Sequence, residues 1–431
     1  MATPTIAPTA ASQRAIPPAL LIACLVLCLI NVYLLQSGFV SHWWIFDEHG
    51  LGIPTDFVNV WSAGRLVLDG HPALAYDWDI QKQIQLEVLG QSYQGNFAWH
   101  YPPPFLFIAS LLALFPYGMA FLSWAAVSFV PYLAVMRAIV GRNFGFLLAA
   151  AFPVVFTNAL VGQNGFLTAS LIGGTLVLMP TRPVLSGICL GLLSYKPQYG
   201  LLFPLVLIAA SQWKVFWTAA IVAVSMALLS WLAFGTESWQ AFVHWMPMFS
   251  QAFLTEGRAP WCKLQSIFGL VRYFGGTEQM AWMFQLIMSG MVAALLALMW
   301  RSRTLDYSLK AAGLAAGALL ITPYLFLYDL MVLAIAVAFL VRVGSEQHFA
   351  HYELPALGLV AALLIVYSLL GAPTGFAATL IVAALIGYRV WPQWREQREP
   401  LRAALPEASL GHNGFAGRMI SAIYEESCHR P

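Results

Sequence analysis

Apolar runs long enough to cross a membrane recur along the whole of this chain. The first covers residues 16–35, and others follow between short turns up to residue 391. A bilayer-spanning helix needs about 20 such residues. Of the 431 residues, 60% are hydrophobic and 9% are charged, whereas soluble domains are about 25% charged. The sequence therefore predicts an all-α polytopic membrane protein, and its net charge of +2 gives no basic excess for binding nucleic acid.

Basic residues mark alternate turns between the apolar runs, and such residues are enriched on the cytoplasmic side of membranes. Arg14 precedes the first run, and further basic turns follow from Arg137 onward. This pattern predicts about twelve transmembrane helices with both termini in the cytoplasm. It divides the chain into a cytoplasmic tail at 1–15, a membrane domain at 16–391 and a cytoplasmic, largely disordered tail at 392–431.

Residues 102–140 leave the helix count open, because the apolar stretch is too long for one straight crossing. It begins with prolines at 102–104 and contains FPYG at 115–118, a candidate break. One long bent helix or three short passes would both bring its basic end to the cytoplasmic side.

Two long segments lie between predicted helices on the outer side. The first, at 36–100, has about 65 residues, far more than the usual 2 to 8 between helices, so we expect it to be functional. A helical period runs from Thr55 or Asp56 to Gly70, and the pattern repeats at 80–89 after Asp79. Both pieces are predicted to be amphipathic helices on the membrane surface. The second long outer loop covers 235–276.

The unusual polar side chains gather on this outer side. A charged group in or beside a bilayer is energetically unfavourable and is a functional candidate by default. A cluster of such groups is a stronger indication than any one of them. The residues on the predicted outer face are Asp56, Arg65, Asp77, His100, Gln163, Asn164, Lys196, Gln198, Arg258, Lys263, Gln265 and Asp329.

Six stretches on this face, taken in order, resemble glycosyltransferase family 87. They read TDFVNVWSAGRLVLDGHPALAYD from residue 55, FAWHYPPPF from 97, GQNG from 162, GLLSYKPQYGLLFPL from 191, KLQSIFGLVRYFGG from 263 and ITPYLFLYDL from 321. The resemblance covers about residues 50–340, and its specificity lies in the ensemble of stretches. That family uses polyprenyl-phosphate-sugar donors, belongs to the GT-C class and includes mannosyltransferases.

The resemblance implies a GT-C fold with a catalytic aspartate on the first outer loop, which matches Asp56 here. It implies transfer of a hexose, with mannose as the first choice, and inversion of configuration. Metal-using members of the wider class carry a further carboxylate close to the first, whereas Asp56 is followed by Phe57. We therefore expect neither a metal nor another cofactor.

Such a transfer also needs a cation for the departing phosphate and polar groups for the sugar. Lys196, at the outer end of a helix, is the first candidate for the phosphate. The further cationic candidates are Arg65, Arg258 and Lys263. The tryptophans that could stack on a sugar ring are Trp61, Trp99 and Trp261. The candidates for contacts with the sugar or the acceptor are Tyr76, Asp77, His100, Tyr101, Gln163, Asn164, Gln198, Gln265 and Asp329.

Several of these residues also have a plain structural interpretation. Asp56 and Asp77 each stand where a helix begins, and aspartate is among the best N-caps. Lys196 is suited to anchoring a helix end at the membrane surface. Asp329 is suited to pairing with a neighbouring helix.

The function that the sequence predicts is a glycosyltransferase of the inner (plasma) membrane with an extracytoplasmic active site. Its partners would be a polyprenyl-phosphate-sugar donor, a glycolipid or polysaccharide acceptor and membrane lipid. The alternative is a transporter or lipid flippase, which would show internal repeats and polar groups at the membrane midplane. A membrane scaffold is a third option, but it has no need of so long an outer loop.

Overall fold

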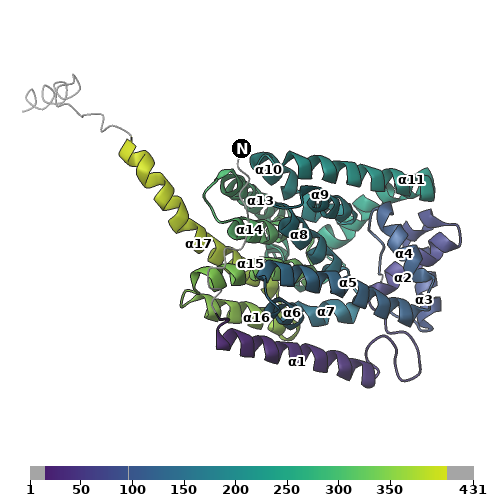
Figure 1. The fold of residues 1–431 in the computed structure, drawn as a ribbon. Helices are drawn as coiled ribbons and strands as arrows, with labels where there is room; N and C mark the ends of the chain where they lie inside the picture. Colours follow the sequence, from purple (N-terminus) through teal and green to yellow (C-terminus); the bar gives the residue numbers. More distant parts are fainter. Residues whose placement is uncertain (1–14, 96, 405–431) are drawn as a thin grey trace, which may run out of the picture. The chain divides into compact units, whose positions relative to one another are not determined.

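The computed structural model of the protein describes residues 15–95 and 97–404, so most of the two predicted tails, 1–15 and 392–431, lies outside it, and residues 392–404 are helical. The described residues form helices joined by loops (Figure 1). Six helices among them are long and apolar enough to cross a membrane, or seven spans if one bent pair counts as one. The chain is therefore a multi-pass membrane protein. The six are α1 (Pro18–Val40), α5 (Tyr117–Val140), α11 (Trp213–Ser250), α13 (Glu278–Arg301), α15 (Met331–Gln347) and α17 (Thr374–Ala404).

The bent pair consists of α6 (Phe144–Ala151) and α7 (Val154–Val161), which meet at 64°. Pro153 lies at the break, since proline has no N–H to continue the helical hydrogen bonds. The Asn31 side chain of α1 donates to the carbonyls of Ala150 and Phe152 at 2.9 and 3.3 Å. It thereby satisfies acceptors at the helix end and fixes α1 beside α6 and α7 (Figure 1).

Shorter apolar helices fill the intervals between the long spans. Because they are shorter than a full crossing, the total of about twelve crossings stays a prediction. Of the most apolar 18-residue stretch within Leu327–Gln347, which contains α15, 89% is buried against neighbouring helices. This helix therefore forms the centre of the bundle. The shorter elements are α8 (Gly165–Leu178), α9 (Pro183–Leu192), η3 (Leu193–Tyr195), η4 (Pro197–Gly200), α10 (Leu202–Ala209), α14 (Tyr307–Leu320) and α16 (Glu353–Leu370).

The segment 36–100, the first predicted outer loop, contains the two expected helices. They are α2 (Phe57–Leu68) and α3 (Trp78–Leu89), joined by the 3-10 turn η1 (Pro72–Tyr76). Asp77 caps α3, because its carboxylate accepts from the backbone N–H groups of Asp79 and Ile80. The prediction that α3 starts at residue 80 after Asp79 was therefore wrong, and the helix begins at Trp78.

The helix α2 is enclosed by protein over most of its surface. Eight of its twelve residues are buried, which differs from the half-exposed helix that an amphipathic pattern predicts. The cause is a close approach to α4 (Leu106–Ala113): a Cβ atom on Gly64 would lie 2.0 Å from the backbone oxygen of Ala109. Only glycine permits this contact, which sets how closely α2 packs against α4.

Residues 102–140 form two helices rather than one. The 3-10 turn η2 (Pro103–Phe105) leads into α4, and the chain then breaks before Pro116 and enters α5. The predicted break at FPYG is thus confirmed. Of the two helices, only α5 is long enough to span a membrane alone.

The segment 235–276, the second predicted outer loop, is mostly helical, which the sequence prediction missed. The helix α11 kinks at Gly235, where φ is 75° and ψ is 170°, and then continues to Ser250. The π-turn η5 (Gln251–Thr255), the 3-10 turn η6 (Trp261–Lys263) and α12 (Ile267–Tyr273) complete the segment. We call residues 236–250 the outer arm of α11.

The loops that carry the candidate residues converge within one compact unit, which ends at Gly387. The 3-10 turn η7 (Leu327–Leu330) contacts α7, α8 and α15, and η3 contacts η2, η4 and α8. Two glycines of the GQNG stretch permit this convergence. Gly162 ends α7 at φ 66°, and a Cβ atom on Gly165 would lie 2.4 Å from the carbonyl oxygen of Tyr328.

Candidate active site

Asp56 stands immediately before α2 but does not cap it. Its side chain makes no hydrogen bond to the first turn of α2, so the capping interpretation of Asp56 does not hold. The Asp56 Oδ2 atom instead accepts a hydrogen bond from Gln163 Nε2 at 3.0 Å. Gln163 Oε1 in turn accepts from the hydroxyl of Tyr101 at 3.1 Å. A carboxylate, an amide and a phenol from three distant segments therefore form one chain of hydrogen bonds.

The protonation of Asp56 is set by opposing influences. Burial of the carboxylate raises its pKa above the ordinary value of 3.8, because removal from water disfavours the charged form. The hydrogen bond from Gln163 and the positive charge of Lys263 act in the opposite direction. A carboxylate with a raised pKa is suited to accepting a proton during catalysis.

Asp56 faces a cavity of about 390 Å³, which we call the Asp56 cavity. Its wall combines this carboxylate with cationic, amide and aromatic side chains. Arg258 is also held by Glu256, whose Oε2 atom accepts from Arg258 Nε at 2.9 Å. The polar side chains of the wall are Asp56, Asn59, His100, Thr157, Gln163, Arg258, Lys263, Tyr324, Tyr328 and Tyr367.

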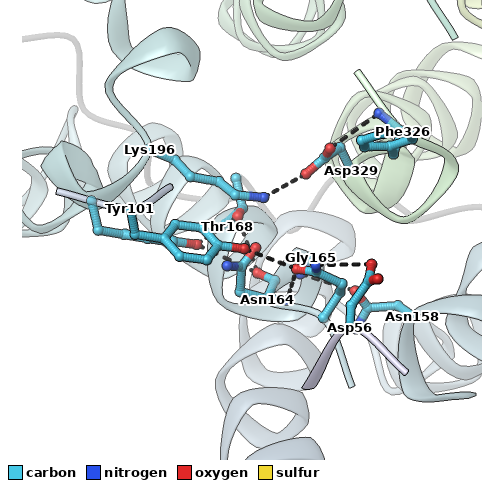
Figure 2. Close-up of polar contacts among 11 residues, drawn as sticks. Asp56, Tyr101, Asn158, Asn164, Gly165, Thr168, Lys196, Phe326 and Asp329 are labelled. Carbon is cyan, nitrogen blue, oxygen red and sulfur yellow. Dashed lines mark hydrogen bonds and ion pairs between the residues drawn. The ribbon is translucent and has the colours of Figure 1, made fainter. Parts of the chain in front are cut away.

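Lys196 and Asp329 form a buried ion pair, with 2.7 Å between Lys196 Nζ and Asp329 Oδ1 (Figure 2). The two side chains are 5% and 4% exposed, so neither charge is compensated by water. Asp329 Oδ2 also accepts from the backbone N–H of Phe326 at 3.2 Å. Lys196 lies between α9 and α10, and Asp329 lies in η7. Their ion pair therefore links these two parts of the chain.

Lys196 also lines a second cavity, of about 360 Å³, which we call the Lys196 cavity. Its wall is mostly aromatic and apolar, and much of it comes from the outer arm of α11. Lys196 is its cationic group, and Gln198 adds an amide. The aromatic side chains of the wall are Tyr76, Trp78, Trp99, His100, Tyr101, Tyr195, Phe242, Trp245, Phe249 and Tyr324.

His100 touches both cavities and has a defined tautomer. Its Nδ1 atom lies 3.1 Å from the carbonyl oxygen of Ala98, which can only accept, so Nδ1 carries the proton. Burial lowers the pKa of His100 to about 4, and the ring is therefore neutral near pH 7. Its Nε2 atom is then a hydrogen-bond acceptor.

Other predicted site residues serve the framework instead. The Tyr76 hydroxyl donates to the Tyr101 carbonyl at 3.0 Å, and Asp77 caps α3. Gln265 Oε1 accepts from the Gly375 N–H at 2.8 Å, and Gln265 Nε2 donates to the Cys262 carbonyl. These contacts tie loops together and leave the side chains little capacity for a substrate.

The structure does not bring Arg65 to the site. Its guanidinium is exposed and pairs with Asp69 one helical turn later, at 3.1 Å. Among the tryptophans considered for stacking, Trp61 donates to the Phe115 carbonyl and Trp261 lies beneath the Arg272 guanidinium. Of the three, Trp99 is the one that lines either of the two cavities described above, namely the Lys196 cavity.

Asn164 is 2% exposed, and its side-chain amide has no hydrogen-bond partner of good geometry in the described part of the chain. It lies beside Tyr101 in Figure 2. Its backbone carbonyl accepts from the hydroxyl of Thr168 at 3.0 Å, one turn later in α8.

The sequence analysis missed Asn59, Phe249 and Tyr324. Asn59 is buried, lines the Asp56 cavity and has an unpaired side-chain oxygen. A signal existed for Asn59, because it follows Asp56 by three residues and so lies on the same helical face. No sequence signal identified Phe249 or Tyr324 among so many aromatic residues.

Within residues 15–95 and 97–404, no group of three or more His, Cys, Asp or Glu side chains is arranged to hold a metal ion. The side chains at this site supply three kinds of group: a carboxylate that can accept a proton, cations that can bind an anionic group, and amides that can hydrogen-bond to hydroxyls.

The model of glycosyltransferase family 87 matches residues 99–323, a little over half of the chain. His100, Gln163, Lys196 and Lys263 lie inside the matched residues, whereas Asp56 lies before them. No curated protein matches the chain.

Proposed function

Since the chain belongs to glycosyltransferase family 87, we propose that this membrane enzyme transfers a hexose from a polyprenyl-phosphate donor to an acceptor hydroxyl. Mannose is the first sugar to test. The observation that carries the proposal is the Asp56 carboxylate, whose pKa is raised by burial and which faces a cavity with cationic and amide groups. A glycosyl transfer needs a base of this kind beside a site for an anionic leaving group.

Asp56 acts as the general base. It takes the proton of the acceptor hydroxyl while the acceptor oxygen forms a bond to the anomeric carbon of the sugar. The bond from that carbon to the phosphate oxygen breaks, and polyprenyl phosphate leaves from the opposite face, so configuration inverts. Gln163 orients the carboxylate, because its other amide end is held by Tyr101.

Lys196 stabilises the charge that develops on the departing phosphate. Its ammonium has three N–H donors, of which Asp329 takes one, so others remain for phosphate oxygens. Asp329 fixes the direction of the ammonium. Arg258 and Lys263 lie on the Asp56 side and are the next candidates for the anion.

Polar groups of the Asp56 cavity hold the sugar and the acceptor. The unpaired oxygen of Asn59 and the acceptor atom of His100 suit sugar hydroxyls. The acceptor would be a glycolipid or the end of a polysaccharide, and surrounding lipid would solvate the donor's prenyl chain. The proposed steps require no metal ion.

The proposal places the site on the extracytoplasmic side of the inner (plasma) membrane, with both termini in the cytoplasm. The long spans, the bent pair and five shorter helices (α8, α9, α10, α14 and α16) would together give about twelve crossings. With these crossings, all the loops that line the two cavities would lie on the same, outer side of the membrane.

The test is transfer of mannose from a short-chain polyprenyl-phosphate-mannose by purified protein, with a panel of glycolipid and oligosaccharide acceptors, with and without EDTA. Asp56→Asn should reduce transfer by about 10²-fold or more, because the base is lost. Asp77→Asn is the matched control, since asparagine caps a helix as well as aspartate does. Equal transfer by Asp56→Asn and the wild type would exclude Asp56 as the base, and loss of transfer in EDTA would contradict the metal-free mechanism.

A further inference from the structure

Three aromatic side chains separate the Asp56 cavity from the Lys196 cavity. His100, Phe249 and Tyr324 are the residues common to both linings in the described part of the chain. The ring centroids of His100 and Phe249 lie 4.4 Å apart, those of Phe249 and Tyr324 5.2 Å, and those of His100 and Tyr324 6.0 Å. We call these three side chains the partition.

The partition lies between the proposed base and the proposed phosphate site, where the sugar would have to fit during the reaction. Inversion requires the attacking hydroxyl and the departing phosphate to stand on opposite faces of the sugar. Asp56 lines one cavity and Lys196 the other. A donor whose phosphate is at Lys196 therefore has aromatic rings between its sugar and the base.

Of the three rings, Phe249 is the one with no polar atom that could anchor it by a hydrogen bond, and it packs against other rings, among them Phe253 with 4.5 Å between ring centroids. His100 is held by the Ala98 carbonyl and stacked on Tyr101, with 4.6 Å between ring centroids. Phe249 lies at the end of the outer arm of α11, followed at once by the π-turn η5, and such turns are frequent at functional sites.

The outer arm also has a hinge at its base. Gly235 adopts φ 75°, a conformation that glycine reaches without strain, and no atom lies within 4 Å of the position that a Cβ would take. A small rotation there would displace the far end of the arm, and Phe249 with it.

We propose that Phe249 makes the enzyme specific for its acceptor over water, an inference that rests on the function proposed above. With the partition closed, a bound donor is kept from Asp56. When an acceptor occupies the Asp56 cavity, the Phe249 ring moves aside and the sugar reaches the base. Closure of this kind prevents side reactions of an activated substrate with water.

The side reaction that the partition suppresses is donor hydrolysis. A water oxygen forms the bond to the anomeric carbon, the bond from that carbon to the phosphate oxygen breaks, and the proton of water passes to Asp56. The products are free sugar and polyprenyl phosphate.

The experiment measures both reactions with polyprenyl-phosphate-mannose: free mannose formed without acceptor, and transfer with acceptor. Phe249→Ala should raise the ratio of hydrolysis to transfer by about tenfold. Phe249→Tyr, which keeps the ring, should restore the wild-type ratio. Phe97→Ala and Phe242→Ala are the controls, since each removes a phenyl group from the wall of one cavity only. A ratio for Phe249→Ala equal to that of the controls would overturn the inference.

A second measurement needs no turnover. With 4-fluorophenylalanine at position 249, the fluorine NMR signal should show two exchanging ring environments, whereas the same label at position 97 should show one. A single sharp signal at position 249 at all temperatures would overturn the moving partition. Absence of any transfer or hydrolysis by the wild-type protein would instead count against the proposed function and with it against acceptor specificity, whereas two fluorine environments at position 249 would still support a ring that moves.

Discussion

At the scale of single residues, Gln163 has the largest influence on the chemistry of Asp56 after burial itself. Its amide N–H stabilises the ionised carboxylate and so lowers the pKa that burial raises. Since Gln163 is also held by Tyr101, the carboxylate has a fixed direction as well as a tuned basicity. The hydrogen-bond chain therefore decides the pH range in which the base is ionised.

Gln163→Leu should move the acidic limb of the pH profile of kcat/KM to higher pH. The base must be ionised, and loss of the donor raises the pKa of Asp56, so activity falls sooner as pH is lowered. A hydrogen bond to a charged group contributes about 1.5–3 kcal/mol, which corresponds to a shift of about one pH unit or more. Tyr101→Phe leaves the Gln163–Asp56 bond in place and should shift the limb less. A shift to lower pH in Gln163→Leu would contradict this account.

The pair of Lys196 and Asp329 gives a second prediction at this scale. Lys196→Gln leaves a buried carboxylate without its partner, and such losses destabilise by about 3–5 kcal/mol. The double variant Lys196→Gln with Asp329→Asn removes both charges and should recover most of the thermal stability, yet transfer should stay low because the phosphate has lost its cation. Melting temperature and transfer, measured on the same preparations, separate the two effects. Full activity of the double variant would exclude Lys196 from phosphate binding.

The sequence predicted part of this residue-level arrangement. Asp56, Gln163, Lys196 and Asp329 were named because amide and charged groups are rare in so apolar a chain. Their pairing depends on contacts across more than a hundred residues, which local patterns do not encode. Arg65 was misplaced for the same reason, since nothing near it in the sequence says which face of α2 is enclosed.

At the scale of elements, the position of Asp56 depends on how closely α2 packs against α4. Gly64 allows the backbone of α2 to meet that of α4. A side chain at this position would contact backbone, which cannot move aside as a flexible side chain can. The two helices would have to separate, and Asp56, at the start of α2, would move with them.

Gly64→Ala should therefore lower both melting temperature and transfer, by about 1–3 kcal/mol in stability. Gly290→Ala in α13 is the matched control, because it lies in a helix with nothing within 4 Å of a new Cβ. That control should be neutral or slightly stabilising, since alanine favours the helix by about 1 kcal/mol. Equal effects of the two substitutions would show that close packing at Gly64 is unimportant.

The elements were predicted best where the signal was local. The helices α2 and α3 followed from the apolar period, although Asp56 does not cap α2 and Asp77 rather than Asp79 caps α3. The break before α5 followed from FPYG. The outer arm of α11 was missed because Gly235 was taken as a helix end. The structure shows a kink there, after which helix-forming residues resume. Glycine alone does not distinguish a stop from a hinge.

At the scale of the whole molecule, the proposed crossings predict on which side of the membrane each loop lies. For the cavity-lining loops to share one face, the shorter helices α10, α14 and α16 must each cross, and α8 and α9 must either both cross or both fail to cross. If α8 did not cross, the turn after it would lie on the same side as Gln163. The basic residues of the turns and the convergence of the polar loops both support the alternating arrangement.

Single cysteines in an otherwise cysteine-free protein test this arrangement. In sealed right-side-out vesicles, a membrane-impermeant maleimide should label Ala372→Cys, in the predicted outer turn between α16 and α17. It should not label Thr181→Cys or Arg303→Cys, which lie in predicted cytoplasmic turns, until the vesicles are opened. Labelling of Thr181→Cys in sealed vesicles would reduce the number of crossings.

The distance along the chain between Lys196 and Asp329 also affects how the protein is made. They are 133 residues apart, and translation adds about 5–20 residues per second, so on the order of ten seconds pass between their syntheses. During that time the nascent chain carries an unpaired cation at the break between two apolar helices. A chain that ends before Asp329 never acquires the partner, and it should be a substrate for membrane proteases that survey newly inserted proteins. Completion of translation is thus the event that neutralises this charge.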